Sequence, residues 1–334
     1  MNQPRYAAGG LALFLVAWVW GLSQANGRSP DPDFERFNAI YEPSGVQQLA
    51  DGRFLVVQDE SEHPVDLFRL PGDGRVSEHS LYRGGLFSWT SRNRELAGLE
   101  DLEGVAQGRD GWVYAITSHS RKDNGKRAAA REQLLRFRVQ GDEVRNVEVV
   151  RGLRKRMTRA FTELKAAGKV REVKEDDGFN IEGLAFDAAR NRLLVGLRAP
   201  LGDEGQALVV VLENPYEMFD KDAEPRFAAR LLGLDLDGGG IRGMAYDPHL
   251  KGYLILARRP GKSFKLWLWD GDTRNRPRRL KIDGLKNLRQ AEGVTPVVRD
   301  GLPYGILIVS DDGDALRSKG GRYVLVGYDR LRGP

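Results

Sequence analysis

The sequence contains no cysteine. This absence excludes disulfide bonds, thiolate zinc sites, cysteine nucleophiles and a cysteine that carries a lipid anchor. The sequence also lacks a Gly-x-Ser-x-Gly elbow, a phosphate-binding loop, a dinucleotide fingerprint and a His-Glu-x-x-His motif. The glycines of Asp237-Gly238-Gly239-Gly240 lie in a turn before a predicted strand and open no helix. The sequence therefore offers no motif that points to the enzyme classes marked by them.

Strong charge of one sign is also missing. The 334 residues carry a formal net charge of +5 with a pI of about 9.3, which favours anionic partners only weakly. A nucleic-acid site would need basic residues interleaved with exposed aromatics or a reading motif, and neither is present. Hydrophobic residues make up 41% of the chain, which is enough for a sizeable core. We expect a globular protein without a nucleic-acid partner.

The first 25 residues have the pattern of a secretory signal. Arg5 supplies the positive charge, Leu11–Leu22 is apolar, and Ser23-Gln24-Ala25 provides small residues for cleavage after Ala25. The apolar run is short for a membrane span, which needs about 20 residues. We therefore expect a periplasmic or secreted protein with no stable membrane span after cleavage. An uncleaved N-terminal membrane anchor is the alternative. Residues 26–33 would be a short linker before a single domain at 34–334.

A motif of the form x-Glu-Gly-aliphatic recurs along the chain, with variation at the Glu position. Each copy is a short strand that is followed by a turn rich in Asp, Gly or Asn and by a strongly apolar strand, which predicts a β-hairpin. Signature positions are 59, 79, 60 and 50 residues apart. The copies are Pro43-Ser44-Gly45-Val46, Leu102-Glu103-Gly104-Val105, Ile181-Glu182-Gly183-Leu184, Ile241-Arg242-Gly243-Met244 and Ala291-Glu292-Gly293-Val294.

Further strand-like runs follow each hairpin, which gives four strands per repeat and the pattern of a propeller blade. The runs are Asp66–Leu70, Gln133–Val139, Ala207–Leu212, Phe264–Trp269 and Tyr323–Tyr328, with a further alternating segment at Arg226–Asp235. The fold class is therefore all-β, a β-propeller with five blades; six blades, one of them degenerate, is the alternative. Phe34–Tyr41 is predicted to supply the outer strand of the last blade, which would leave no free sheet edge.

Two insertions interrupt the repeat. Arg154–Ala167 is helix-forming and Gly168 is a plausible stop, so we predict one helical insertion, interpreted as a solvated surface helix. Ser120–Arg131 is a second, basic insertion after the second strand of its blade.

Asn180-Ile181-Glu182-Gly183-Leu184, followed by Gly196-Leu197-Arg198-Ala199-Pro200, resembles the hallmark of an exported bacterial propeller family, domain of unknown function 3616. That family is similar in turn to the esterase-like propellers found with phytases, although this sequence shows no phytase motif. The resemblance implies a fold and a compartment rather than a reaction.

The first strand of each blade lines the channel of a propeller, so equivalent signature positions should form a ring at one mouth. The end of the antiparallel second strand returns to that mouth and should add a second ring, with His63 and His119 just behind it. Both basic insertions leave from the same face, so we predict an acidic centre with a basic rim. The first ring is Ser44, Glu103, Glu182, Arg242 and Glu292, and the second is Asp59, Ser118, Arg198, Arg258 and Asp311.

Converging carboxylates repel one another. Two unit charges about 4 Å apart repel by roughly 4 kcal/mol at an effective dielectric constant near 20. A bound cation, a shared proton or neighbouring arginines would relieve this repulsion. The structural interpretation pairs Glu182 with Arg198, and Arg242 with Glu103 or Glu292. The Gly after each Glu would then allow close packing at the axis.

A metal ion is the second interpretation. Carboxylates without cysteine form a hard oxygen set that suits Ca²⁺ or Mg²⁺; otherwise no cofactor is expected. The predicted ligands are Glu103, Glu182, Glu292, Asp311 and Asp59, with Asp312 behind them.

Two functions remain open, and the sequence does not decide whether the protein is an enzyme. The first is metal-assisted hydrolysis of a phosphorylated or other anionic ester, in which His119 or His63 moves a proton. The second is a non-catalytic envelope module that binds an anionic small molecule, envelope component or protein partner through the same face. The predicted substrate-binding residues are Arg198, Arg242, Arg258, Arg259 and Ser118.

Overall fold

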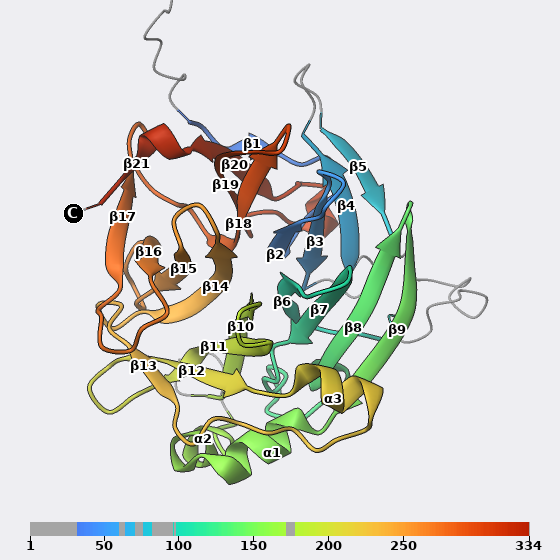
Figure 1. The fold of residues 1–334 in the computed structure, drawn as a ribbon, viewed down its shortest axis with the longest axis vertical. Coiled ribbons are helices and arrows are strands. Elements are labelled where there is room, and N and C mark those ends of the chain that lie inside the picture. The colour runs from blue at the N-terminus through green and yellow to red at the C-terminus, as the bar shows by residue number, and fades with distance from the viewer. Residues whose placement is uncertain are drawn as a thin grey trace, which may run out of the picture. The chain divides into compact units, whose positions relative to one another are not determined.

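Five β-sheets surround a central axis in the computed structural model (Figure 1). The structure describes residues 32–59, 64–70, 76–81, 96, 98–171 and 178–333. Each sheet is an antiparallel blade whose first strand lies nearest the axis, as the alternating hairpin pattern predicts; four of the sheets have four strands and the fourth blade has five. The protein is a five-bladed β-propeller, and the predicted fold class is confirmed.

The strands take the same order in every blade. The first strands are β2 (Pro43–Gln48), β6 (Leu102–Gln107), β10 (Asn180–Asp187), β14 (Gly240–Asp247) and β18 (Ala291–Arg299). The second strands are β3 (Phe54–Gln58), β7 (Trp112–Thr117), β11 (Arg192–Leu201), β15 (Gly252–Arg258) and β19 (Leu302–Ser310). The third strands are β4 (Val65–Arg69), β8 (Gln133–Gln140), β12 (Ala207–Leu212), β16 (Lys265–Trp269) and β20 (Arg322–Gly327). The fourth strands are β5 (Ser77–Ser80), β9 (Glu143–Arg151), β13 (Leu232–Leu234), β17 (Arg278–Ile282) and β1 (Glu35–Arg36).

Both ends of the described chain join the ring. β1 pairs with β20 and completes the fifth blade, so the predicted closure by the segment at 34–41 is confirmed. The short strand β21 (Leu331–Arg332) pairs with β17 and adds a fifth strand to the fourth blade, which the repeat pattern did not predict. The predicted strand at Arg226–Asp235 is much shorter, because only β13 and a bridge between Phe227 and Leu212 form there.

The hydrophobic core is divided among the interfaces between blades. Five clusters of buried apolar side chains occur, and each joins two consecutive blades. Leu55 and Leu135, for example, share the cluster between the first and second blades, and both are fully buried. Because apolar burial is a major stabilising term, these interfaces hold the blades at fixed angles around the axis.

A β-bulge occurs in every first strand at the Glu position of the repeated motif. In β10, for example, Ile181 pairs with Leu197 and Gly183 pairs with Gly196, so Glu182 is left out of the register. The other four first strands shift register at the equivalent position. A bulge redirects a side chain, and here it sets the Glu-position residue at the axis.

The glycine after each bulge is required by close approach between neighbouring first strands. A Cβ on Gly243 would lie 2.2 Å from the carbonyl oxygen of Glu292, and one on Gly45 would lie 2.8 Å from that of Glu103. Such distances are far below van der Waals contact. The x-Glu-Gly-aliphatic motif therefore builds a tight axis, as the structural interpretation predicted.

The predicted helix at 154–167 is divided into two. α1 (Leu153–Ala160) and α2 (Thr162–Ala167) meet at Phe161, whose backbone is extended. Leu153, Met157 and Leu164 are fully buried in the cluster between the second and third blades, and α2 contacts β11. The interpretation as a solvated surface helix is therefore wrong, because one face of the pair is apolar and docked. A third helix, α3 (Pro215–Asp220), was not predicted.

The described residues also form three short 3₁₀ turns: η2 (Ala129–Arg131), η3 (Ala315–Arg317) and η4 (Tyr328–Arg330). Within the ranges that the structure describes, no helix is long and apolar enough to cross a membrane. The signal or anchor predicted for residues 1–25 lies outside the described residues.

Candidate functional site

The five bulged side chains gather at one end of the channel, called here the bulge end. Ser44, Glu103, Glu182 and Glu292 line a single narrow space. Arg242 joins them through contacts with Glu182 and Glu292. Four of the five are at most 8% exposed, and Glu292 is half-buried. The ring expected from the repeat is therefore present: Ser44, Glu103, Glu182, Arg242 and Glu292.

Arginines neutralise the part of the ring that belongs to the third, fourth and fifth blades. Arg242 Nη1 lies 3.2 Å from Glu182 Oε2 and 3.0 Å from Glu292 Oε1, and so bridges two blades. Arg198 Nη1 lies 2.8 Å from the other oxygen of Glu182, which also accepts a bond from Asn180 at 3.3 Å. The predicted pairs of Glu182 with Arg198 and of Arg242 with Glu292 are therefore present.

Glu103 has no such partner among the described residues. Burial raises the pKa of its carboxyl well above the usual range, and the carboxylates of Glu182 and Asp101 raise it further. A buried acid without a donor keeps its proton or attracts a cation. Arginines therefore neutralise the ring in the third, fourth and fifth blades but not at Glu103 in the second.

Two further acids stand at the same end, as predicted from the ends of the second strands. Loss of hydration raises the pKa of Asp59 to about 8, with contributions from the charge and hydrogen bond of Asp101, although part of its side chain still contacts solvent. Burial raises the pKa of Asp311 to about 7, followed by the charges of Glu42 and Glu182. Burial, with Glu182 and Asp311, likewise holds the pKa of Glu292 well above its usual range. Carboxyl groups at this end therefore keep protons near neutral pH.

Three of the four predicted arginines line one pocket beside the channel. Arg198, Arg242 and Arg258 face a cavity of about 840 Å³ between α2 and the loops that follow β11 and β15. Arg242 and Arg258 lie 5.6 and 5.2 Å from the centre of the Phe264 ring, which orients both guanidinium groups. Arg259 is exposed beside Gly238 and does not line this pocket, because successive residues at a strand end face opposite sides.

Ser118 and His119 are buried rather than presented to a ligand. The hydroxyl group of Ser118 donates to Asp101 and bonds to Ser120 at 2.9 Å. The ring of His119 is fully buried, with Nδ1 2.8 Å from the Thr117 carbonyl oxygen, and burial lowers its pKa to about 4. Its charged neighbours are Glu132, Arg154 and Arg127 rather than the channel acids, so His119 is not placed to move a proton at the mouth. His63 lies outside the described residues.

Asp101 and Glu42 belong to this site but were not singled out from the sequence. Asp101 accepts bonds from Ser120 at 2.9 Å and from Arg131 at 2.9 Å, and it raises the pKa of Asp59. Glu42 raises the pKa values of both Asp59 and Asp311. Each stands two residues before the Glu position of its repeat. That position holds a polar residue in four of the five copies, which was the available signal.

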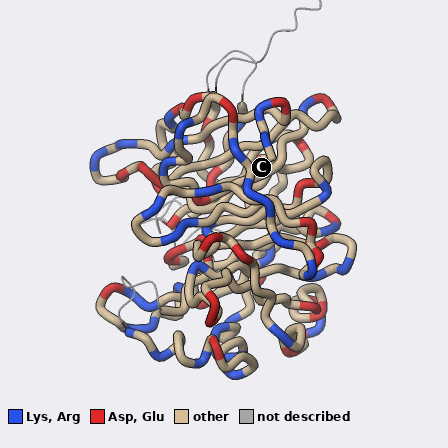
Figure 2. Tube along the Cα trace, turned by 90° about the vertical axis from the view of Figure 1, so that its left-hand side faces the viewer, with Lys and Arg blue, Asp and Glu red and all other residues tan. Residues whose placement is uncertain are grey.

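The predicted basic rim carries mixed charge. Lys122 pairs with Glu100 at 2.8 Å, and Arg127 pairs with Glu132. Figure 2 shows basic and acidic positions interleaved along the chain. The rim therefore presents alternating charges instead of one positive surface.

No group of three or more His, Asp or Glu side chains in the described ranges is arranged to hold a metal ion. The candidate ligands share one end of the channel: Glu103, Glu182, Glu292, Asp311 and Asp59. Two of them, Glu182 and Glu292, form ion pairs with arginines. The Ca²⁺ or Mg²⁺ site stays a prediction.

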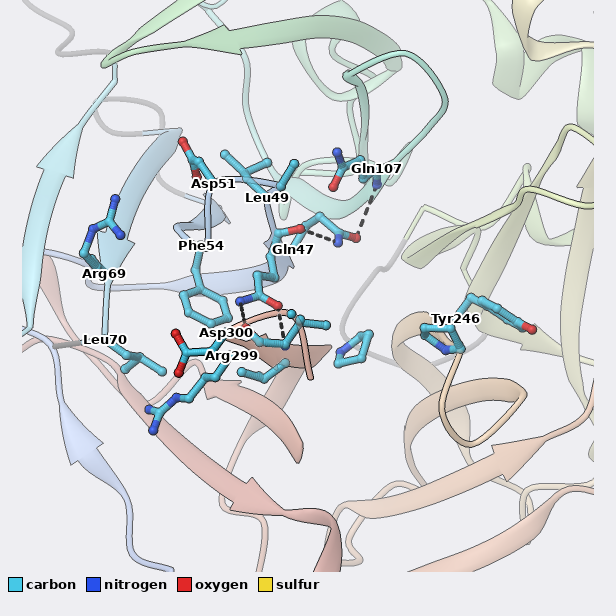
Figure 3. Close-up of a pocket in the computed structure, with 18 residues that line it drawn as sticks. Gln47, Leu49, Asp51, Phe54, Arg69, Leu70, Gln107, Tyr246, Arg299 and Asp300 are labelled. Atoms are coloured by element: carbon cyan, nitrogen blue, oxygen red, sulfur yellow. Dashed lines mark hydrogen bonds between the residues drawn. The ribbon is translucent and has the colours of Figure 1, made fainter. Parts of the chain in front are cut away.

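The opposite end of the channel, called here the turn end, carries three glutamine amides beside charged and apolar side chains (Figure 3). Gln48 donates to the Val298 carbonyl at 2.9 Å and accepts from its N–H at 2.7 Å, which ties the first blade to the fifth. Gln47 accepts from the backbone N–H of Gln107 at 3.3 Å and ties the first blade to the second. The amides at this end therefore join strands without any net charge.

Comparison with known proteins identifies part of the chain. Residues 173–327 match the model of a family described as a protein of unknown function, DUF3616. These residues form a DUF3616 domain. They include β10 to β20, and with them both segments that carried the resemblance in the sequence. The DUF3616 match thus covers the three arginines of the pocket, whereas α2, Glu103 and Asp59 precede it.

Two solved structures are similar to this chain at low sequence identity. A putative oxidoreductase (glucose dehydrogenase) from Thermus thermophilus is 16% identical, covers 88% of this chain and 100% of its own, and has a TM-score of 0.44. The PQQ-bound aldose sugar dehydrogenase from Streptomyces coelicolor is 14% identical over 89% of this chain and 99% of its own, with a TM-score of 0.42. No curated protein matches the sequence.

Proposed function

We propose that the bulge end and the adjoining arginine pocket form one site, which hydrolyses an ester that carries a negative charge. The observation that carries the proposal is that arginines in a pocket lie next to buried carboxyl groups whose pKa values are raised. Arg198, Arg242 and Arg258 line the pocket, and Arg242 also reaches the channel ring, where burial raises the pKa of Glu103 and Glu292. Perturbed acids beside a cavity are typical of functional sites.

The roles follow from the chemistry of these groups. Arg258 has no carboxylate partner among the described residues, so its charge is available to the anionic group of a ligand. Asp311, with a pKa of about 7, can donate a proton to a leaving oxygen. Water would add to the acyl carbon or phosphorus, the bond to the leaving oxygen would break, and a proton from the water would restore the carboxyl group. The net reaction consumes one water and needs no other reactant.

The test is hydrolysis of p-nitrophenyl phosphate and of the neutral p-nitrophenyl acetate, each with Ca²⁺, Mg²⁺ or EDTA. We expect the anionic ester to be preferred, and Arg258→Gln to lower kcat/KM roughly 10- to 100-fold, the range for a hydrogen bond to a charged group. Arg259→Gln is the matched control and should leave the rate unchanged. Loss of turnover in EDTA would assign the carboxylates to a metal. An absence of turnover under all conditions would exclude the hydrolase.

The pH dependence of the rate is a separate prediction. Asp311 acts in its protonated form, so kcat should fall as the pH rises through about 7. Asp311→Asn should lower kcat and remove this step from the profile. A rate that rises through pH 7 in the unaltered protein would contradict the assignment of Asp311 as the acid.

A non-catalytic ligand-binding module is the alternative, and the burial of His119 and Ser118 favours it. Neither group reaches the mouth, so no activated hydroxyl or imidazole is supplied by these two predicted residues. Such a module would bind anions without turnover, with an affinity that falls as salt is added. Binding of p-nitrophenyl phosphate without product release would select this function.

A further inference from the structure

The arginine pocket has two chemically different walls. One wall carries the guanidinium groups of Arg198, Arg242 and Arg258. The other is apolar and comes from α2, the segment after it, the end of β11 and the loop after β15: Ala166, Val170, Pro200, Leu201 and Pro260. The exposed acids Glu163 and Asp203 also line the pocket, so three arginines stand against two carboxylates.

The cationic wall retains unused capacity for an anion. Arg242 is 7% exposed, and its Nε is buried without a hydrogen-bond partner, although its Nη1 serves two glutamates. A buried donor left unpaired is costly, and an anion or an ordered water would satisfy it. Arg258 adds a guanidinium group that has no carboxylate partner in the described part of the chain.

The apolar wall is held in place by the two insertions. The Gly168 carbonyl, at the end of α2, accepts bonds from Arg121 at 3.2 Å and from Arg154 at 2.9 Å. Two cations at a helix C-terminus complement its dipole. Leu164 and Ala167, on the inner face of α2, are buried. The wall is therefore preformed, which is usual for small-molecule sites.

We propose that this pocket takes an amphiphilic anion, with an anionic headgroup on the arginines and an alkyl or aryl tail against α2, Pro200 and Leu201. The inference rests on the proposed function in that it names the substrate class of the same site. It commits to a single detached molecule rather than a membrane surface, because the apolar wall faces into a cavity of about 840 Å³ between loops.

The test is calorimetric titration of the full protein with inorganic phosphate, ethyl phosphate, butyl phosphate and octyl phosphate. Affinity should rise roughly two- to fourfold per methylene until the apolar wall is covered, because each buried methylene contributes favourably. Arg258→Gln should weaken all four ligands about tenfold or more, as expected for a charged hydrogen bond. Val170→Asn should weaken octyl phosphate and leave ethyl phosphate unchanged.

Thr162→Asn, an exposed change at the start of α2 that does not line the pocket, is the control. If Val170→Asn does not fold, the exposed Ala166→Asn tests the same wall. Affinity independent of tail length, or binding only to phosphatidylcholine vesicles that contain phosphatidic acid, would overturn the inference. Tail-dependent binding without turnover on any ester would refute the hydrolase and leave this inference standing. Ester turnover combined with an affinity that does not depend on tail length would support the hydrolase and refute this inference.

Discussion

The two ends of the channel hold their carboxylates in opposite ways. At the turn end, Asp51 pairs with Arg53 at 2.6 Å and Asp187 with Arg192 at 2.9 Å, each within one hairpin. Burial opposes ionisation there, yet the arginine hydrogen bonds hold the pKa of both acids below the usual range. At the bulge end, burial and facing acids raise the pKa of Glu103.

The difference follows from where the partner stands in the chain. A hairpin places an arginine beside an acid through local register, so the pair forms whenever the turn forms. Rotation around the axis instead brings equivalent positions of different blades together, so Glu103 meets Glu182. The raised pKa of Glu103 at the bulge end is therefore a consequence of the repeat.

The largest loss of stability should come from adding a side chain where two first strands contact each other at the axis. Gly243→Ala would place a methyl group 2.2 Å from the Glu292 carbonyl oxygen, a backbone atom that cannot move away easily. We expect a loss of more than about 3 kcal/mol in the free energy of unfolding, as for severe overpacking. Thermal denaturation followed by circular dichroism measures it.

Gly301→Ala is the control at the turn end. Gly301 has a φ of 75° with open space around its Cα, so alanine there should cost only about 1 kcal/mol of backbone strain. Equal losses in the two variants would show that backbone strain rather than close approach governs the axis.

The next effect contrasts two buried acids. The folded state keeps the proton of Glu103 above pH 4.3, about where an unfolded Glu loses its proton, so its contribution to stability is full in acid and lost as the pH rises. Glu103→Gln should therefore raise Tm by about 2–4 °C at pH 8 and leave it unchanged at pH 4. For Asp187, whose pKa is lowered, stability is present above pH 3.9 or so and lost as the pH falls.

Asp187→Asn should accordingly lower Tm by about 2–4 °C at pH 8, with a smaller difference near pH 2. Melting curves of both variants from pH 2 to 8 give the comparison. Destabilisation by Glu103→Gln at pH 8 would mean that the ionised carboxylate is bound to a cation or donor, which would favour the metal interpretation.

The sequence predicted the features that repeat and missed those that depend on docking. Five copies of one motif placed Glu182 beside Arg198, because register and rotation follow from the pattern alone. His119 resembles a surface turn residue in Ser-His-Ser, yet Glu132 and Arg154 approach it from a 3₁₀ turn and a helix distant in sequence. Likewise, the periodicity of 154–167 predicts a helix but not which neighbour covers its apolar face, so the pocket wall was not foreseen.

The smallest effect tests whether the acids at the bulge end act as one group. Glu42 raises the pKa of both Asp59 and Asp311, which stand at about 8 and about 7. Glu42→Gln should therefore lower both apparent pKa values, as measured by carbon-13 NMR titration of the aspartate carboxyl groups. Asp51→Asn removes an acid at the turn end and should move neither. Coupled acids share their protons, so both aspartates should respond. A change confined to one of them would show that Asp59 and Asp311 titrate independently, and that the proposed proton donor Asp311 does not share its proton with the acids around Glu103.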